Sequence, residues 1–329
     1  MKIAIRPNIR LSLIQSDASY CLIATDQSQQ FFHYGVGQFE SDPEFGSLMN
    51  GFGNSKTELF GFFSRNKLFV HQEFSGQKGS RYSRQKSYYA SRFKNLDAEK
   101  LQAKVEQAKC AVVGVGGIGC HVADQLARIG VREIVLVDHD RVEPSNLNRQ
   151  VLYEEQDVGR EKTHAAENRL KNIRRSLDVS TFPDVASFLK KCDVSSLGAV
   201  FVSADESQLA LRATLSRTLY PKGIFSVYVG YNGHTAMIGP CTMAGVMGCG
   251  ACAANLSDLD GITKNLPHML ATPASAYSIN AIAASIAVET WLSVNAIEND
   301  RPFTIEFSME TLTAERKEVQ LIEGCPVCG

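Results

Sequence analysis

Residues 110–138 read CAVVGVGGIGCHVADQLARIGVREIVLVD, and this stretch decides the fold. An apolar run leads into a glycine loop, a helix-like segment follows, and a second apolar run ends in Asp138. Nucleotide-binding units have this order of strand, glycine turn, helix and strand, with an acid about twenty residues past the glycines. The loop glycines are Gly114, Gly116, Gly117 and Gly119. They let a phosphate approach N–H groups at a helix N-terminus, and we expect Asp138 to accept hydrogen bonds from a ribose.

A polar set after Asp138 separates this chain from an ordinary dehydrogenase. Its members are Asp140, Asn146, Arg149, Gln150 and Lys162. Hydride transfer does not need them, whereas a site that holds a triphosphate and supports attack on it does. Cationic side chains stabilise the charge that develops as a nucleophile attacks phosphorus. Taken alone, Lys162 would more often be a solvated lysine on a helix.

Length, charge and cysteine content narrow the class of protein. A chain of 329 residues can bury a full core and carry one large domain and a smaller one. The net charge of −1 gives no basic footprint for nucleic acid. No charged-then-apolar signal segment opens the sequence, and the apolar helix expected over 276–294 contains Asn280 and Glu289, which favours a core helix over a membrane span. The nine cysteines are an odd number, so we expect reduced thiols in a cytoplasmic protein.

The sequence divides into regions of different texture. Residues 1–75 are rich in aromatic residues and glycine and predict a small separate domain, with strands over 1–13 and 19–25. A turn-rich linker over 76–80 and a polar helix over 97–109 follow. The α/β core is then predicted to have strands near 111–115, 133–138, 179–183 and 199–204, a hairpin of 225–231 and 235–239 around Asn232-Gly233, the helix over 276–294 and a strand over 303–309.

Two Cys-x-x-Cys pairs are a candidate metal site. They are Cys249 with Cys252 and Cys325 with Cys328. Two such pairs can supply four thiolates to one tetrahedral zinc, and such a closed site is structural because no position stays open for water. Redox-active disulfides are the alternative.

These motifs together resemble the ubiquitin-activating-like, or ThiF-type, superfamily of adenylating enzymes. The resemblance covers roughly residues 80–329 and includes, besides the cysteine pairs, Arg81–Gln85, Gly114–Gly119, Val137–Asp140, Ser145–Gln150, Gly159–Lys162 and Ser203–Asp205. Within it the chain looks most like the peptide-modifying branch of the microcin C adenylating enzyme and the pantocin A maturation enzyme. Members of that branch carry an N-terminal domain that clamps a precursor peptide.

The resemblance implies the fold and the domains. We expect an α/β, Rossmann-like, ATP-binding adenylation domain with a mixed sheet and the four-cysteine zinc site over 110–329. A small α+β clamp domain over 1–75 would precede it, and 76–109 would be a linker and helix that carries an arginine finger.

The resemblance also assigns catalytic residues, namely Arg84, Arg149, Lys162 and Asp205. Asn146, Arg149 and Lys162 would contact the triphosphate. Asp205 would bind magnesium, although a lone aspartate here could simply cap the helix that starts at Glu206. Arg84 would reach into the ATP site of a partner subunit, which implies a homodimer; the alternative is an ordinary exposed arginine.

The activity implied is ATP- and magnesium-dependent activation, by adenylation, of a carboxylate on a ribosomally made precursor peptide. Residues 253–275 contain no cysteine, which argues against a thioester or persulfide relay on this loop. Direct capture within the peptide would give a cyclised, pantocin-type product. The alternatives are microcin C-type nucleotidylation of a peptide C-terminus, adenylation of a sulfur-carrier protein, a catalytically silent peptide-binding module, and activation by phosphorylation.

Overall fold

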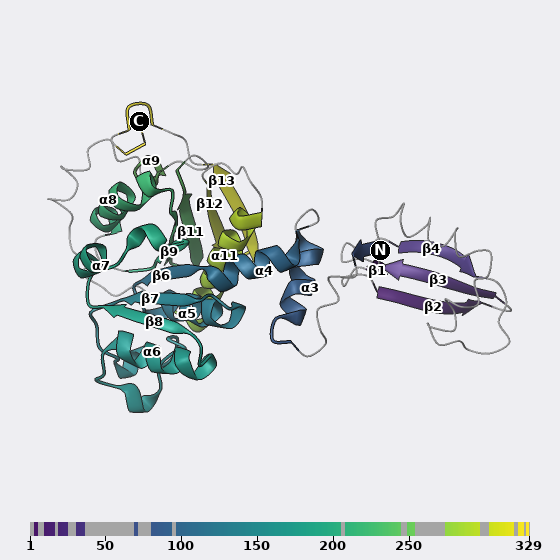
Figure 1. Cartoon of the computed structure of the whole chain (residues 1–329), viewed down its shortest axis with the longest axis horizontal. Helices are drawn as coiled ribbons and strands as arrows, with labels where there is room; N and C mark the ends of the chain where they lie inside the picture. Colours follow the sequence, from purple (N-terminus) through teal and green to yellow (C-terminus); the bar gives the residue numbers. More distant parts are fainter. Residues whose placement is uncertain are drawn as a thin grey trace. The chain divides into compact units, whose positions relative to one another are not determined.

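The computed structural model describes residues 80–93, 97–204, 208–244, 249–253, 274–296, 303–318, 322–325 and 327–328, and five strands within residues 3–71. The chain separates into two compact units, Met1–Gln102 and Ala103–Gly329 (Figure 1). Asp205, most of the linker over 76–80 and nearly all of the loop over 253–275 lie outside the described residues. The predictions made for them therefore stay predictions.

The first unit contains two small antiparallel sheets among its described residues. In one, β1 (Ile3–Ile5) pairs with β5 (Phe69–His71); in the other, β3 (Ser19–Thr25) lies between β2 (Arg10–Ser16) and β4 (Phe31–Val36). The strand expected over 19–25 is confirmed, whereas the run over 1–13 forms parts of two strands instead of one. Helix α3 (Ser83–Arg92) follows, and α4 (Ala98–Gln107) crosses the boundary between the units.

The second unit is built on a mixed sheet of eight strands in the order β13-β12-β11-β10-β9-β6-β7-β8 (Figure 1). The strands are β6 (Lys109–Val113), β7 (Glu133–Val137), β8 (Asp178–Phe182), β9 (Ala199–Val202), β10 (Phe225–Asn232), β11 (Thr235–Thr242), β12 (Phe303–Ser308) and β13 (Thr313–Glu318). The pairs among β8, β7, β6, β9 and β10 are parallel, and those from β10 to β13 are antiparallel. The predicted mixed α/β sheet is confirmed.

Helices cover both faces of this sheet. They are α5 (Gly117–Ile129), α6 (Lys162–Ile173), α7 (Val185–Lys191), α8 (Gln208–Leu219), the short α9 (Gly250–Ala253) and α11 (Tyr277–Ala296). Alternate strand residues such as Val113 and Val202 pack with Phe188 of α7 and Leu215 of α8. The opposite face lies under α5 and α11, where the ring of Trp291 meets Phe201 edge-on. None of the described helices is both long and apolar enough to cross a bilayer.

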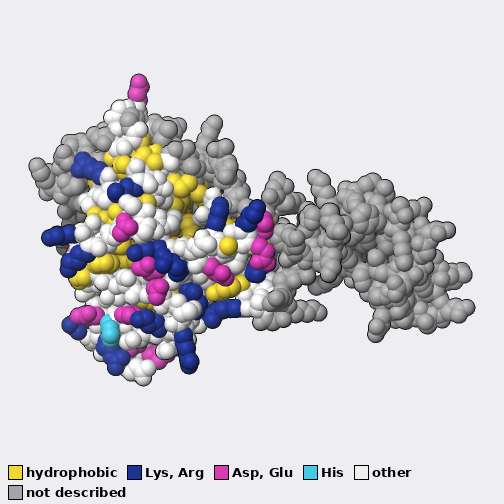
Figure 2. Space-filling view, in the orientation of Figure 1, with side chains coloured by type: hydrophobic (Ala, Val, Ile, Leu, Met, Phe, Trp, Pro, Cys, Tyr) yellow, Lys and Arg dark blue, Asp and Glu magenta, His cyan; other side chains and the backbone are white. Residues whose placement is uncertain are grey.

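The parallel strands set the position of the site. In chain order they run third, second, first, fourth, fifth across the sheet, so the direction of winding reverses between β6 and β9. Ligands of such sheets bind at the carboxyl ends of the strands beside this reversal. On the face of the unit seen in Figure 2, Lys and Arg side chains lie among Asp and Glu side chains, in keeping with the near-zero net charge.

Candidate functional site

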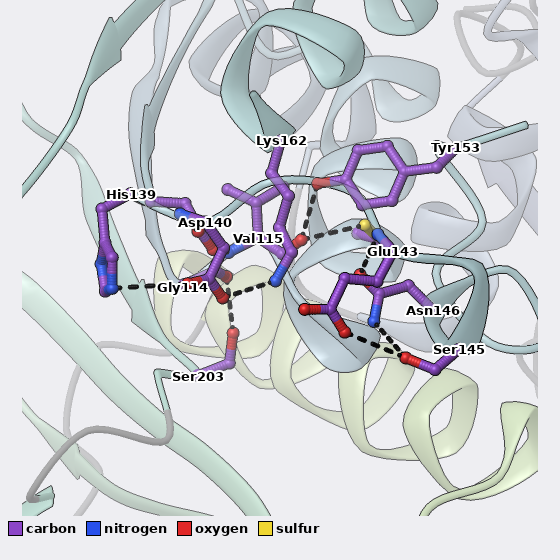
Figure 3. A network of polar contacts seen from close by, with 12 residues as sticks. Gly114, Val115, His139, Asp140, Glu143, Ser145, Asn146, Tyr153, Lys162 and Ser203 are labelled. Atoms are coloured by element: carbon purple, nitrogen blue, oxygen red, sulfur yellow. Dashed lines mark hydrogen bonds and ion pairs between the residues drawn. The ribbon is translucent and has the colours of Figure 1, made fainter. Parts of the chain in front are cut away.

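The predicted glycine loop lies at this reversal. It follows β6, while Asp138 follows the neighbouring β7. Ser203 follows β9 and lies beside Gly114 of the loop (Figure 3). A cavity of about 310 Å³ lies elsewhere in the unit, between Lys104, Gly198 and Trp291, where β6 and β9 begin. Because the carboxyl ends of parallel strands carry the chemistry of such sheets, we place the site at the glycine loop.

Two glycines of the loop are required by close backbone contacts. Gly114 has a φ of +86°, and a Cβ there would lie 2.7 Å from the backbone nitrogen of Ala204. A Cβ on Gly119 would overlap the carbonyl group of Gly114. Gly116 differs, because the nearest atom to its Cβ position is Nε2 of Gln150, 3.9 Å away. The loop is therefore packed closely on one side and open at Gly116, where a phosphate could approach the N–H groups that begin α5.

Two hydroxyl groups hold the loop in place: that of Ser203, which belongs to a motif of the sequence analysis, and that of Tyr153, which the sequence analysis did not identify. The Tyr153 hydroxyl donates a hydrogen bond to the carbonyl oxygen of Val115 at 2.8 Å, and the Ser203 hydroxyl donates to that of Gly114 at 2.9 Å (Figure 3). Burial raises the pKa of Tyr153 well above its usual value, so the phenol keeps its proton and remains a donor. No motif carried this information, because each bond joins segments that meet only in the folded chain.

Asp138 is fixed by backbone donors. Its Oδ2 accepts the N–H of Val115 at 2.6 Å, and its Oδ1 accepts the N–H of Asp140 at 2.8 Å. The carboxylate thereby bridges the glycine loop and the segment after β7. A carboxylate oxygen can accept more than one hydrogen bond, so the half-buried Asp138 retains capacity for the ribose hydroxyls predicted for it.

Asp140 and Lys162 form an ion pair beside the loop. The ammonium group of Lys162 lies 2.7 Å from Oδ2 of Asp140, and Figure 3 shows the two side chains pointing toward one another. Lys162 is the first residue of α6, and its side chain is only 7% exposed, whereas that of Asp140 is 53% exposed. The chain therefore holds a buried cation at the site with a partner that water can reach. The sequence analysis placed both residues in one polar set but did not predict that they pair with each other.

The segment over 144–150 brings three predicted residues to the same region. Asn146 ends the short 3-10 helix η3 (Pro144–Asn146), is buried, and accepts the N–H of Glu143 through Oδ1 at 3.1 Å. The guanidinium of Arg149 donates to the carbonyl oxygen of Ser145 at 2.7 Å and to Oδ1 of Asn148 at 3.0 Å. Both of these hydrogen bonds of Arg149 stay within its own segment, and neither joins it to Lys162 or Asp140.

The third predicted residue, Gln150, and His121 of α5 are buried, and each has an unsatisfied side-chain atom among the described residues, which in His121 is Nε2. Gln150 is buried, and its Oε1 has no hydrogen-bond partner among the described residues. His121 of α5 hydrogen-bonds the backbone of Arg149 and meets the ring of Tyr277 edge-on, with ring centroids 4.6 Å apart. Burial lowers the pKa of His121, so the ring is neutral near neutral pH.

Two of the predicted catalytic residues lie outside the part of the second unit that the structure describes. Arg84 is exposed in the first turn of α3 and belongs to the first unit. Asp205 lies outside the described residues, directly after Ala204. The roles predicted for both, an arginine finger and a magnesium ligand, stay predictions.

The four cysteines of the two pairs meet in space. All four sulfur atoms lie within 4.8 Å of one another. Sulfur–sulfur distances are 3.7 Å for Cys249–Cys252, 3.5 Å for Cys249–Cys325 and 3.4 Å for Cys252–Cys328. These are far longer than the roughly 2.0 Å of a disulfide. A tetrahedral zinc with bonds of about 2.3 Å separates its sulfurs by about 3.8 Å, so the cluster has the size of a metal site.

The surroundings of the cluster shift the pKa values of its cysteines in different directions. Burial raises the pKa of Cys249. Burial also acts on Cys325, but hydrogen bonds from the backbone of Val327 and Cys328 outweigh it and lower its pKa to about 7. Bound zinc would supply the missing positive charge for all four sulfurs.

The comparison with known families agrees with this geometry. The model of the ThiF family matches residues 89–327. The chain therefore belongs to the ThiF family, and the family expected from the sequence is confirmed.

Curated relatives match over part of the chain. The adenylyltransferase and sulfurtransferase UBA4 of Meyerozyma guilliermondii is 35% identical over 119 residues, which is 36% of this chain and 27% of the relative. The sulfur carrier protein ThiS adenylyltransferase of Bacillus subtilis is 43% identical over 81 residues, 24% of each chain. This chain thus spans about a quarter of the length of these relatives.

Solved structures match over much more of the chain. The microcin C7 biosynthetic enzyme MccB, in complex with N-formylated MccA, aligns with a TM-score of 0.74 and 21% identity over 100% of both chains. E. coli MccB with ATP gives 0.74 and 22% over the same coverage. PaaA gives 0.63 and 22% over 85% of this chain and 98% of its own. At this identity the similarity shows a shared fold.

Proposed function

We propose that this protein is an ATP- and magnesium-dependent enzyme that adenylates a carboxylate of a ribosomally made peptide. The observation that carries the proposal is the open side of the glycine loop at Gly116, next to the ion pair of Asp140 with the buried Lys162. The N-terminus of α5 and the buried ammonium group of Lys162 both lie at the carboxyl ends of the parallel strands. Together they suit a phosphate group that is being attacked by a nucleophile. Membership of the ThiF family supports ATP as that phosphate source.

The chemistry is a displacement at the α-phosphorus. A carboxylate oxygen forms the new O–P bond, and pyrophosphate leaves with the electrons of the broken bond. In this proposal Asp138 holds the ribose, while Asn146, Arg149, Gln150 and Lys162 contact the phosphates. Asp205 would hold a magnesium ion, which neutralises phosphate charge when bound. The four-cysteine cluster would hold a structural zinc.

A peptide substrate is supported by the solved structures that share the fold. MccB was solved in complex with the peptide N-formylated MccA, and this chain aligns with it over its whole length. We infer that residues 1–75 clamp the precursor peptide, as predicted from their position. We also propose a homodimer in which Arg84 completes the partner's ATP site.

The fate of the acyl-adenylate distinguishes the candidate products. We propose capture inside the peptide, in which a nitrogen or carbon nucleophile bonds to the acyl carbon, a proton is released and AMP leaves, so the peptide loses one water overall. The second candidate keeps the nucleotide on the product, and the full-length alignment with MccB favours it. Adenylation of a sulfur-carrier protein is less favoured, because those relatives match only part of this chain.

Mass spectrometry of a peptide encoded next to this gene tests the proposal after incubation with the full-length protein, ATP and magnesium. Loss of water from the peptide, with release of AMP and pyrophosphate, supports adenylation and cyclisation. A gain of a nucleotidyl mass supports the second candidate, and ADP with inorganic phosphate would show phosphorylation instead. Unchanged peptide with bound ATP would indicate the wrong peptide or a silent binder. A Lys162→Gln variant should give no product, which controls for contaminating activity.

A further inference from the structure

Two helices begin together at the open side of the glycine loop. Asn280 of α11 lies against Gly117, the first residue of α5, and about two turns further Nε2 of Gln125 donates to Oγ of Ser285 at 3.2 Å. The first of these contacts places the first turn of α11 beside the start of α5. The positive ends of both helix dipoles therefore meet beside Gly117, where the first N–H groups of each helix lack acceptors within the helix.

Asn280 carries an unsatisfied acceptor at this place. The residue is 0% exposed. Its Nδ2 donates to the carbonyl oxygen of Ala276 at 2.8 Å and to Oγ of Ser275 at 3.0 Å. The carbonyl oxygen of Ala276 can only accept, so this contact fixes which end of the amide is nitrogen. Oδ1 is then left without a donor among the described residues, although a buried carbonyl oxygen normally has one.

The whole amide of Asn280, the unsatisfied oxygen included, lies against the loop, with Nδ2 2.8 Å from the position a Cβ would take on Gly117. Oδ1 of Asn280 lies 2.9 Å from the position a Cβ would take on Gly117. On the other side, Gln150 approaches Gly116 and has an unsatisfied Oε1. Gly116 and Gly117 are themselves partly exposed, so solvent reaches the loop between these two side chains. Two acceptors without donors thus flank a point where two helix N-termini favour an anion.

The nucleotide alone does not account for both the helix N-termini and the unsatisfied oxygen of Asn280. Asp138, predicted to hold the ribose, follows β7 on one side of β6, whereas α11 packs on β10 and β11 on the other side. Asn280 therefore lies across the start of α5 from the ribose end. A group that fits there offers negative charge to the helix ends and an N–H to the amide oxygen. A carboxylate with a neighbouring peptide N–H has both.

We propose that Asn280 is a substrate-positioning residue, whose Oδ1 accepts the peptide N–H adjacent to the carboxylate that is activated. This inference rests on the proposed function, because it names the subsite for the acyl substrate of that reaction. Holding the N–H turns the carboxylate toward the phosphate bound at α5. Losing the contact should weaken carboxylate binding and leave ATP binding unchanged.

A matched pair of small carboxylates tests the contact. N-acetylglycine has an amide N–H next to its carboxylate, and acetoxyacetate is the same molecule with an ester oxygen in place of that N–H. Their affinities for the full-length protein are measured by ligand-observed NMR, with magnesium and α,β-methylene-ATP present so that no chemistry occurs. We expect the wild-type protein to bind N-acetylglycine about fivefold more tightly, as one neutral hydrogen bond allows.

Two variants separate contact from structure. Asn280→Leu keeps the branched shape of the side chain and removes the acceptor, so the two probes should bind about equally. Ser285→Ala alters the same helix away from the loop and should keep the wild-type preference. A preference that survives in Asn280→Leu, one that is also lost in Ser285→Ala, or a wild-type protein that binds neither probe would each overturn the proposal.

The same probes distinguish failure of this inference from failure of the proposed function. Exchange of labelled pyrophosphate into ATP, driven by N-acetylglycine, reports formation of the acyl-adenylate. An Asn280-dependent amide preference without exchange would refute adenylation and keep the subsite. Exchange with no dependence on Asn280 would keep adenylation and remove the subsite.

Discussion

Gly119→Ala should damage the nucleotide site through packing alone. A Cβ at this position would overlap the carbonyl oxygen of Gly114 and lie 2.9 Å from both its carbonyl carbon and Oγ of Ser203, closer than Cβ atoms are found. The same carbonyl oxygen accepts the hydrogen bond of Ser203 at 2.9 Å, so the clash also strains that bond. Overpacking and the weakened hydrogen bond together cost about 3–4 kcal/mol. The better helix propensity of alanine returns about 1 kcal/mol, which leaves a net loss of about 2–3 kcal/mol.

Thermal unfolding followed by circular dichroism measures this loss. For a unit of this size, about 2–3 kcal/mol lowers Tm by roughly 5–10 °C. Gly116→Ala is the matched control, because its Cβ would meet nothing closer than Nε2 of Gln150 at 3.9 Å. We expect it to keep Tm but to bind ATP more weakly in calorimetry, since the methyl group would stand on the open side of the loop. A wild-type Tm for Gly119→Ala, or an equal loss in Gly116→Ala, would refute this account of the loop.

Three further predictions concern charge, metal and pH. Lys162→Gln should reduce kcat/KM for ATP-dependent turnover about 100-fold or more, because it removes a desolvated cation, while Lys171→Gln, at an exposed lysine, should leave steady-state rates unchanged. Cys325→Ser should lower both the zinc content measured by atomic emission and the Tm, whereas Cys192→Ser should change neither. Burial lowers the pKa of His121 below its ordinary 6.5, so this side chain binds protons less readily in the folded state than in the unfolded state. The free energy of unfolding should therefore have its full value above pH 6.5 and fall as the pH drops through the folded-state pKa. His121→Gln should flatten that part of a plot of urea midpoint against pH; an unchanged slope would contradict the assignment.

Most of the parallel core could be predicted from the sequence, because apolar runs and glycine turns are local signals. The predicted boundaries were displaced by about two residues at β6, since Gly114 and Val115 belong to the loop and not to the strand. The predicted hairpin is confirmed, but its turn is centred on Gly233 and His234, with φ of Gly233 at +58° and Asn232 paired to Thr235. β13 was not predicted, because this fully exposed edge strand reads TAERKE and has no apolar alternation.

The same distinction holds for the site: some of its residues could be predicted from local sequence patterns, whereas others are brought together only by the tertiary structure. Asp138, Asp140, Lys162 and the four cysteines could be predicted because fixed spacings along the chain carry them. Their meeting in space is now seen for the Asp140–Lys162 pair and for the cysteine cluster. Tyr153 and Asn280 could not be predicted, because the atoms they face lie 38 and 163 positions away in sequence, at Val115 and Gly117. In an apolar helix, Asn280 was interpreted only as evidence against a membrane span.

The unequal burial of the Asp140–Lys162 pair has a consequence for phosphate binding. An ammonium group that is 7% exposed needs a counter-charge, and Asp140 supplies it at 2.7 Å when no phosphate is present. If both members were buried, moving Lys162 onto a phosphate would leave an unpaired buried carboxylate, at a cost of about 3–5 kcal/mol. Because Asp140 is 53% exposed, water can solvate it when the lysine turns away, so the exchange of partners costs far less. The pair therefore holds Lys162 in position without competing strongly with the nucleotide.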